Sequence, residues 1–331
     1  MALTPTDDKH KMQIEAGTVG RKRGHKFEAT LSKAINIMPD KHFVPQPRTD
    51  DTQHLFTGNP AQKLLQYIAD DTGKEILDAH ASWLGGLATS GLGDAVLDEN
   101  GKPITKSKSD VLIQLTTVAG TEIIGISVKT CSKKTPTNDQ MYFTTARAFC
   151  TLLRSNEISV SMEAERGLSM FCGDEGFRPL EILSPKQLHD RITNQNRDPN
   201  RFYWEELTEQ AKKDWKTIFT NYQDKITLLL FQKAYKDDPF PPTYLLHQTV
   251  RYNNFDNCEI ALFSMKEIVM LSRKHNEFEL SEYRIRKGRY KNDTSLHSAP
   301  RFGFIQFQRG GQKQHPTQLQ FNLKAGYFRH I

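Results

Sequence analysis

The sequence predicts an α/β (α+β) fold, and three patterns support this class. Two runs rich in β-branched and aliphatic residues lie close together at 110–115 and 123–129, as is typical of paired strands. Apolar residues recur at three- and four-residue steps at 27–35 and again at 204–235, which is typical of helices that bury one face. From residue 243 onward short alternating runs dominate, so we expect strands to prevail there.

The first predicted helix carries a glutamate at the edge of its buried face. Phe27, Leu31 and Ile35 are spaced as one side of a helix, and Glu28 stands three residues before Leu31. Most glutamates in such positions are solvated or pair with a neighbouring side chain, which is the plain alternative for Glu28. The preceding residues 1–19 are polar, and we expect them to be flexible and only partly ordered.

The remaining elements follow from helix starts, helix stops and alternation. A second helix should begin at Asn59-Pro60 and break near Gly73, with 76–77 still on helical spacing, and 93–97 is a candidate first strand of the sheet. After the paired strands we expect a loop and then a helix at 138–153. A polar helical segment should follow at 184–240 and stop at the prolines of 239–242. The later expectations are strands at 244–250 and 259–263, a helix at 265–271, and a hairpin of 302–307 with 318–323.

The paired strands bring chemically useful side chains together. Asp110 opens the first strand, and Ser127 and Lys129 share one face of the second because side chains alternate along a strand. If the two runs form a hairpin, Asp110 lies near Lys129. A carboxylate that can bind a hard cation, beside a lysine that can position a water, suits metal-assisted cleavage of a phosphodiester. An ordinary surface hairpin with a solvated lysine is the alternative interpretation.

Asp110, Lys129 and the run Arg23-Gly24-x-x-Phe27-Glu28 resemble the PD-(D/E)XK nucleases, the superfamily that holds most type II restriction endonucleases. The resemblance covers about residues 20–153 and implies a restriction-endonuclease-like core with a mixed central sheet flanked by helices. It implies that Asp110 and Glu28 bind Mg²⁺ and that Lys129 orients the attacking water.

Ser127 departs from the family pattern, because most members carry a second acid at that position. A serine occurs there in a subset of restriction enzymes, in which a carboxylate from elsewhere completes the site. Asp139, Gln140 and Glu163 are the nearest candidates in this chain to supply what Ser127 lacks. The sequence leaves open whether one or two metal ions are used.

The expected organisation has four parts. They are a flexible N-terminus at 1–19, a nuclease catalytic core at 20–183, a helical segment at 184–242, and a strand-rich DNA-recognition part at 243–331 that is either separate from the core or continuous with it. The expected partner is double-stranded DNA, and a homodimer would supply one active site for each strand. The long helix around Trp215 is a candidate dimer interface, and its apolar positions could equally be core within one chain. The side chains expected to contact DNA are Lys133, Lys134, Arg284, Arg286, Arg289, Gln308, Arg309 and Gln312.

Composition narrows the class of protein. The 331 residues carry a formal net charge of +6, which suits a nucleic-acid partner. The four cysteines are scattered, and we expect free thiols in a reducing cytoplasm rather than a zinc site. Neither a membrane span nor a secretory signal is expected, and no motif of a nucleoside-triphosphate site occurs. Two alternatives stay open: a non-catalytic DNA-binding protein with a degenerate nuclease fold, and a repair or mobile-element nuclease of the same superfamily.

Overall fold

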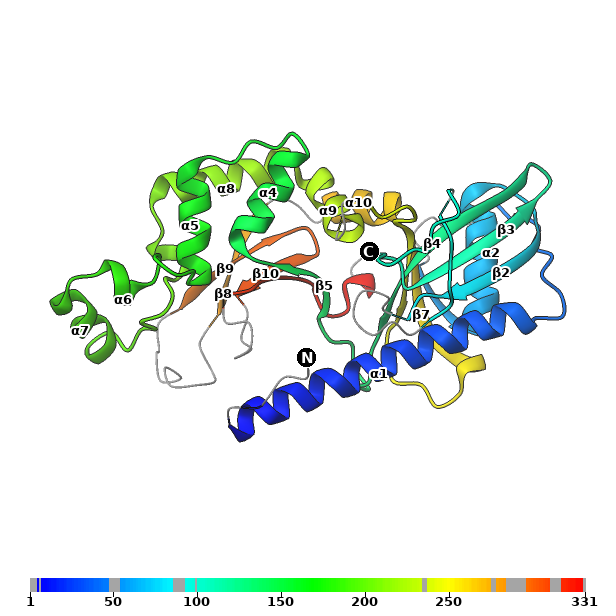
Figure 1. Ribbon diagram of the computed structural model, residues 1–331, viewed down its shortest axis with the longest axis horizontal. Helices are drawn as coiled ribbons and strands as arrows, with labels where there is room; N and C mark the ends of the chain where they lie inside the picture. The colour runs from blue at the N-terminus through cyan, green and yellow to red at the C-terminus, as the bar shows by residue number, and fades with distance from the viewer. Residues whose placement is uncertain are drawn as a thin grey trace. The chain divides into compact units, whose positions relative to one another are not determined.

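The computed structural model describes residues 5, 7–47, 54–85, 93–98, 100–233, 237–274, 278–283, 296–309 and 317–329 (Figure 1). The chain divides into two compact units. Unit 1 comprises Met1–Asp139, Leu228–Met270 and Ala325–Ile331, and unit 2 comprises Gln140–Thr227 and Leu271–Lys324. The chain therefore enters unit 2 twice, whereas the sequence led us to expect consecutive segments.

Unit 1 is built on a six-stranded sheet in the order β1-β7-β6-β4-β3-β2. Neighbouring strands are antiparallel except β4 and β6, which run parallel, so the sheet is mixed. The predicted α/β class, with a mixed central sheet flanked by helices, is confirmed. The strands are β1 (Leu55–Gly58), β2 (Ile76–Trp83), β3 (Val111–Thr117), β4 (Gly120–Thr130), β6 (Pro242–Gln248) and β7 (Cys258–Ser264).

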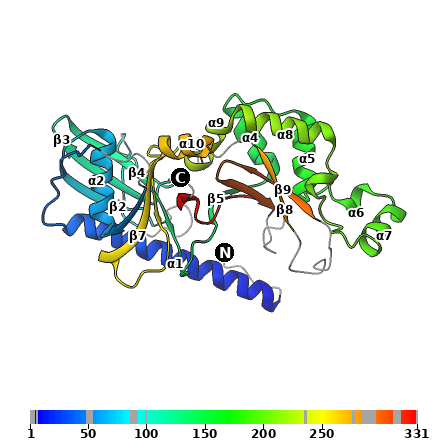
Figure 2. The same cartoon turned by 180° about the vertical axis from the view of Figure 1, so that it is seen from behind.

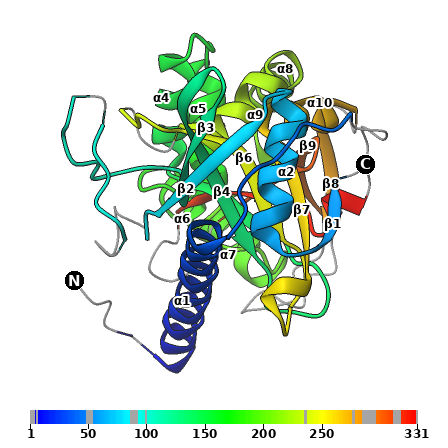
Figure 3. The same cartoon turned by 90° about the vertical axis from the view of Figure 1, so that its right-hand side faces the viewer.

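Two helices, α1 (Asp8–Ile37) and α2 (Pro60–Thr72), cover one face of this sheet (Figure 3). Phe27 and Leu31 of α1 and Leu64 of α2 are fully or almost fully buried against alternate residues of the strands, among them Ile113 and Ile126. This apolar contact fixes the direction of α1 across the sheet. The remaining elements of unit 1 include η2 (Phe255–Asn257), η3 (Tyr327–Arg329) and the start of α10 (Met265–Lys274).

Capping residues explain where these helices begin and end. The Asn59 side chain accepts hydrogen bonds from the first turn of α2, Pro60 occupies its first position, and Gly73 ends it at φ 65°. The second predicted helix is therefore confirmed. In contrast, α1 begins at Asp8 because the Asp7 side chain accepts from His10 N at 2.8 Å. Residues 8–19 are helical, although their polar composition led us to expect an irregular segment.

Three further expectations need correction. Residues 76–83 form strand β2 and not the tail of a helix, because small buried residues such as Ala79 and Ala81 pack against the core. The segment 93–97 makes only an isolated bridge, from Leu97 to Pro103, and β2 takes its expected place beside β3. The helix expected at 138–153 is a strand, β5 (Asp139–Thr144), followed by α4 (Ala146–Ser155), which the Thr145 side chain caps.

Unit 2 carries a five-stranded sheet in the order β5-β11-β10-β9-β8. Helices α4, α5 and α8 lie on one side of it (Figure 2). Strands β10 and β11 pair as expected, but a turn at Gly303 splits the expected arm 302–307 between β9 and β10. Its elements besides β5 and α4 are α5 (Met162–Cys172), α6 (Pro179–Ile182), α7 (Pro185–Thr193), η1 (Trp204–Glu206), α8 (Glu209–Asn221), α9 (Gln223–Gln232, shared with unit 1), β8 (Glu279–Tyr283), β9 (His297–Phe302), β10 (Ile305–Arg309) and β11 (Leu319–Leu323).

Aromatic side chains form the core between these helices and the sheet. Phe149 of α4 lies 4.7 Å from Phe321 of β11 between ring centroids, and Phe219 of α8 lies 4.5 Å from Phe302. Trp215 is fully buried, and its Nε1 donates to the carbonyl of Ala164. The apolar face around Trp215 therefore belongs to the core of unit 2 and is not available as a dimer interface.

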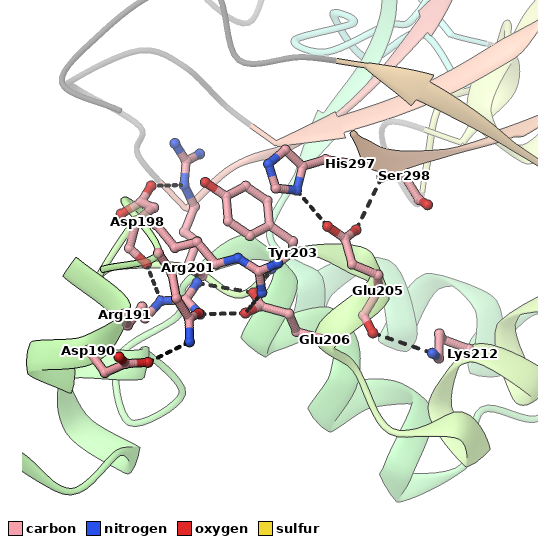
Figure 4. Close-up of polar contacts among 12 residues, drawn as sticks. Asp190, Arg191, Asp198, Arg201, Tyr203, Glu205, Glu206, Lys212, His297 and Ser298 are labelled. Carbon is pink, nitrogen blue, oxygen red and sulfur yellow. Dashed lines mark hydrogen bonds and ion pairs between the residues drawn. The ribbon is translucent and has the colours of Figure 1, made fainter. Parts of the chain in front are cut away.

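A buried polar network also lies in unit 2 (Figure 4). Arg191 donates to both carboxylate oxygens of Glu206, at 2.5 and 3.1 Å. His297 Nδ1 lies 2.5 Å from Glu205 Oε1, and its ring stacks on Tyr203 at 3.9 Å between centroids. These contacts join residues 191–206 to the first residue of β9.

All four cysteines are buried and free, as expected. Within the described ranges, no helix combines the length and the apolar character that crossing a membrane requires.

Candidate active site

A clamped loop holds Asp110 at the start of β3. The Asp238 carboxylate accepts from Lys108 N at 2.6 Å and from Ser107 Oγ at 3.0 Å, and Ser109 Oγ donates to the carbonyl of Phe240 at 2.7 Å. Asp110 N then donates to the carbonyl of Ile126 on β4 at 2.8 Å. The backbone that carries Asp110 is therefore fixed from both sides.

Gly125 permits this arrangement. A Cβ atom at Gly125 would lie 2.3 Å from Ser109 Oγ and 2.8 Å from the carbonyl oxygen of Pro241. Because glycine has no side chain, β4 can lie directly against the loop that precedes Asp110.

The hairpin brings Asp110, Ser127 and Lys129 together. Asp110 Oδ2 accepts from Val128 N at 2.6 Å and lies 3.5 Å from Ser127 Oγ. Lys129 Nζ lies 3.4 Å from Ser127 Oγ. Alternation along β4 places Ser127 and Lys129 on one face, as the sequence predicted. The carboxylate, the hydroxyl and the ammonium group thus form one continuous cluster.

Helix α1 adds Glu28 to this cluster. Glu28 is almost fully buried, and its Oε2 accepts a hydrogen bond from Trp83 Nε1 at 3.1 Å. Burial and the nearby charge of Asp110 raise the pKa of Glu28 to about 8, although the Trp83 bond and the charge of Lys129 act in the opposite direction. A Cβ atom at Gly24, one turn earlier, would lie only 3.3 Å from Glu28 Oε1, so the glycine leaves room for the carboxyl group.

Three residues at this cluster were not assigned a role from the sequence. The first is Trp83, which donates a hydrogen bond to Glu28. The second is His25, whose ring lies 6.1 Å from that of Trp83 between centroids. Burial and the charge of Arg21 lower the pKa of His25, while Asp110 acts in the opposite direction. His25 stands three residues before Glu28, on the same side of the helix, and this spacing is the signal that could have indicated it.

Lys108 is the third residue and carries a second amine next to the acids. Burial and the charge of Lys129 lower the pKa of Lys108 to about 8, and Asp110 opposes this shift. Its place two residues before Asp110 made it one of several lysines around the candidate site, but nothing in the sequence distinguished it from the exposed Lys102 and Lys106.

The cluster contains two carboxyl groups. Among the described residues, no group of three or more His, Cys, Asp or Glu side chains is arranged to hold one metal ion. Of the residues considered to replace the missing acid at Ser127, Asp139 lies 2.7 Å from the buried His247. Gln140 is an exposed residue of β5, and Glu163 is exposed in the first turn of α5. A cation at this site would therefore have two protein carboxylates, with water and a substrate oxygen completing its shell.

The residues expected to contact DNA lie in several places. Lys133 and Lys134 are exposed on the loop after β4, and Gln308 is exposed on β10, where its amide contacts that of Gln306 at 3.3 Å. Arg309 ends β10, but its side chain lies outside the described residues. The expected contacts that fall entirely outside them are Arg284, Arg286, Arg289 and Gln312.

Comparison with known proteins adds a structural likeness. No protein-family model matches the chain, and no curated protein matches its sequence. Among solved structures, the chain is similar to the restriction endonuclease MspI in complex with its cognate DNA, at 13% identity and a TM-score of 0.42. The likeness covers 79% of this chain and 76% of that one. Similarity at this level assigns no function, which must come from the site itself.

Proposed function

We propose that this protein is a Mg²⁺-dependent endodeoxyribonuclease that hydrolyses phosphodiester bonds in double-stranded DNA, as a type II restriction endonuclease does. One observation supports the proposal most directly. At the end of a hairpin, Ser127 Oγ lies within hydrogen-bond reach of both the Asp110 carboxylate and the Lys129 ammonium group, and the charge of Asp110 acts on the buried Glu28. Acids beside a lysine can serve phosphoryl hydrolysis, whereas an ordinary surface hairpin would leave these groups apart and solvated.

The two acids fit a hard cation. Two carboxyl groups that share a partly buried place repel each other when both are ionised, and this repulsion contributes to the raised pKa of Glu28. Oxygen donors of this kind are the ligands that Mg²⁺ prefers, and Asp110 and Glu28 would hold it. When bound, Mg²⁺ would polarise the phosphodiester and make a water molecule a better nucleophile.

The other residues of the site would bind and orient. Lys129 would position the attacking water and stabilise negative charge on the phosphoryl oxygens. Ser127 would hold the side chains of Lys129 and Asp110 in position, since its Oγ lies within 3.5 Å of both. Trp83 would aim the Glu28 carboxyl group through its indole N–H.

A pH dependence follows from Glu28. Because its pKa is raised to about 8, the group holds a proton at neutral pH in the absence of metal, and a cation must displace that proton. We expect the affinity for Mg²⁺ to rise with pH up to about 8 and to level off above it. Isothermal titration of Mg²⁺ between pH 6 and 9 would measure this, and Glu28→Gln should remove the dependence.

The substrate assignment draws on charge and on side-chain chemistry. The chain carries a net charge of +6, and the lysines of the loop after β4 are exposed next to the site. Gln308 is exposed on β10, beside the half-buried Gln306 and the buried Asn322, and an exposed glutamine amide can recognise adenine. Gln308→Ala should relax choice at one base pair, at a cost of about 1–3 kcal/mol.

A second candidate function is that of a non-catalytic DNA-binding protein. Ser127 cannot neutralise a second cation, and the described part of the site lacks a third acid, so this possibility has its own support. Incubation of plasmid DNA with the protein and Mg²⁺ separates the candidates. Discrete bands support a restriction enzyme, a smear supports a repair or mobile-element nuclease, and intact plasmid bound by the protein supports the non-catalytic function. An EDTA control tests the metal requirement.

A homodimer is part of the proposal, because cutting both strands of a palindromic site is simplest with two related active sites. Sedimentation with and without a DNA duplex tests it, and a monomeric mass under both conditions would exclude it.

A further inference from the structure

A basic groove of about 470 Å³ opens in unit 1 directly beyond the end of β4. Thr130, the last residue of β4 and the neighbour of Lys129 in the chain, is part of its lining. Arg23 and Lys26 of α1 form one wall, and Arg251 and Tyr252, which follow β6, form another. The groove is therefore continuous in sequence with the lysine of the candidate active site and shares helix α1 with Glu28.

The positive charge of this groove has no counterpart within the described residues. Its lining contains no aspartate or glutamate. Arg23, Lys26 and Arg251 are exposed, and none of them makes an ion pair with an acid in the part of the chain that the structure describes. Elsewhere in the protein, exposed basic residues such as Lys74 and Arg273 do pair with acids. Three cations without acids around one hollow favour an anionic ligand.

Backbone contacts hold the walls of the groove in place. Cys131 N donates to the Gln248 carbonyl at 3.0 Å and to its Oε1 at 3.1 Å. Arg251 N donates to the carbonyl of Lys133 at 2.7 Å, which ties the two loops together. The groove is thus formed before any ligand binds, which reduces the ordering that binding requires.

An aromatic wall accompanies the cations. Tyr252 is half-buried, and its ring meets that of the buried Phe27 edge-on at 5.8 Å between centroids. Cations together with an aromatic surface match a nucleic-acid strand, whose phosphates alternate with sugars and bases.

We propose that this groove binds the phosphodiester backbone of DNA on one side of the cleaved bond, with Arg23, Lys26 and Arg251 as phosphate contacts and Tyr252 as the wall for a sugar or base. The position of the cleaved bond rests on the proposed function. The binding itself does not, because it requires no catalysis and can be measured without metal.

Two glycines of α1 provide a matched test. Gly20 lines the groove and Gly17 does not, and a Cβ atom at either position meets nothing within 4 Å. Gly20→Glu should therefore fold at least as well as the wild type while placing a carboxylate in the groove. We expect it to weaken binding of a 20-base-pair duplex about tenfold or more at 100 mM salt without metal. Gly17→Glu adds the same charge one helical turn earlier, where it does not stand among the residues that line the groove, and should cost about threefold or less.

Neutral substitutions complete the test. Gly20→Gln should bind within about twofold of wild type, which would show that charge and not bulk causes the loss. Arg251→Ala should weaken binding to all duplexes alike and reduce the slope of log affinity against log salt by about 1. Two results would each reject the proposal that the groove binds DNA. One is equal binding by the Gly20→Glu and Gly17→Glu variants, and the other is an unchanged salt slope in Arg251→Ala. Plasmid cleavage by the wild type is measured separately. If the variants lose DNA affinity as expected but the wild type does not cleave, only the proposed nuclease activity is rejected. If the wild type cleaves but the variants keep their DNA affinity, only the proposed DNA binding by the groove is rejected.

Discussion

Each of the two units holds a glutamate largely out of the solvent, and the two glutamates have opposite electrostatic surroundings. In unit 2, burial would raise the pKa of Glu206, but hydrogen bonds from Arg191 and Tyr203 N–H and the charges of Arg191 and Arg197 lower it overall. In unit 1, burial and the charge of Asp110 raise the pKa of Glu28 to about 8. Unit 2 neutralises its buried acid internally, whereas unit 1 does not.

The two glutamates therefore have different roles. The charge of Glu206 supports the fold of unit 2, whereas the carboxyl group of Glu28 is available for chemistry. Arg191 donates to Glu206 and also to the carbonyls of Asp198 and Arg201, so this network is complete within unit 2 (Figure 4). Glu28 receives one hydrogen bond from Trp83 and lies beside a second acid. A buried carboxyl group held in such an unfavourable state is typical of functional sites.

The largest effects should come from breaking the cluster in unit 1. Asp110→Ala and Lys129→Ala should each lower the rate of DNA cleavage by about a thousandfold or more, because each removes a charged group aimed at the reacting phosphate. DNA binding should stay within about threefold of wild type in Lys129→Ala and become equal or tighter in Asp110→Ala without metal. Glu163→Ala is the control, since Glu163 is an exposed acid of unit 2. If either variant cleaves DNA at the wild-type rate, that residue does not belong to the active site.

The next effect concerns stability in unit 2. Arg191→Ala should destabilise the protein by about 3–5 kcal/mol, because it removes a buried guanidinium group and leaves the largely buried Glu206 without its main partner. Arg197→Ala removes a more exposed partner of the same carboxylate and should cost about 1 kcal/mol. Urea denaturation at pH 7 measures both. Equal losses of stability in the two variants would show that Arg191 is not the main partner of the Glu206 carboxylate.

A smaller effect of opposite sign is expected at Glu28. Its raised pKa means that the folded state resists ionisation, so stability should fall as pH rises from about 4.5 to about 8. Glu28→Gln should therefore be more stable than wild type by about 1–3 kcal/mol at pH 9 without metal, and nearly equal at pH 5. Thermal unfolding at the two pH values tests this. Added Mg²⁺ should stabilise the wild type and not the variant. A variant that is less stable at pH 9 contradicts the account of unit 1.

The smallest effects are expected on the exposed loop after β4. Lys133→Ala and Lys134→Ala should each weaken DNA binding by about two- to fivefold, for every sequence alike, as expected for solvated phosphate contacts. Filter binding at several salt concentrations would measure it, with Lys74→Ala as the control on a distant exposed lysine that is paired with Glu122. A loss confined to one sequence would mean that these lysines read bases instead.

The sequence by itself determined the elements whose signal is local. Alternation identified the β3–β4 hairpin and placed Ser127 and Lys129 on one face, because a strand has a fixed period of two. Caps and turn residues identified α2, from Asn59 to Gly73. Helical spacing placed Phe27 and Leu31 in the core and Glu28 at its edge.

Only the tertiary structure decided which distant segments meet. Trp83 ends strand β2, of which the sequence indicated only the first residues, 76–77, and those as helix, and it reaches Glu28 from 55 residues away. The Asp238 carboxylate organises the loop before Asp110 from 130 residues away. The pKa of Glu28 depends on burial and on charges brought by other elements, and no local pattern encodes either. Spacing along a chain fixes the face on which a side chain stands, but the desolvation and the neighbouring charges that give that side chain its chemistry arise only when separate elements pack together.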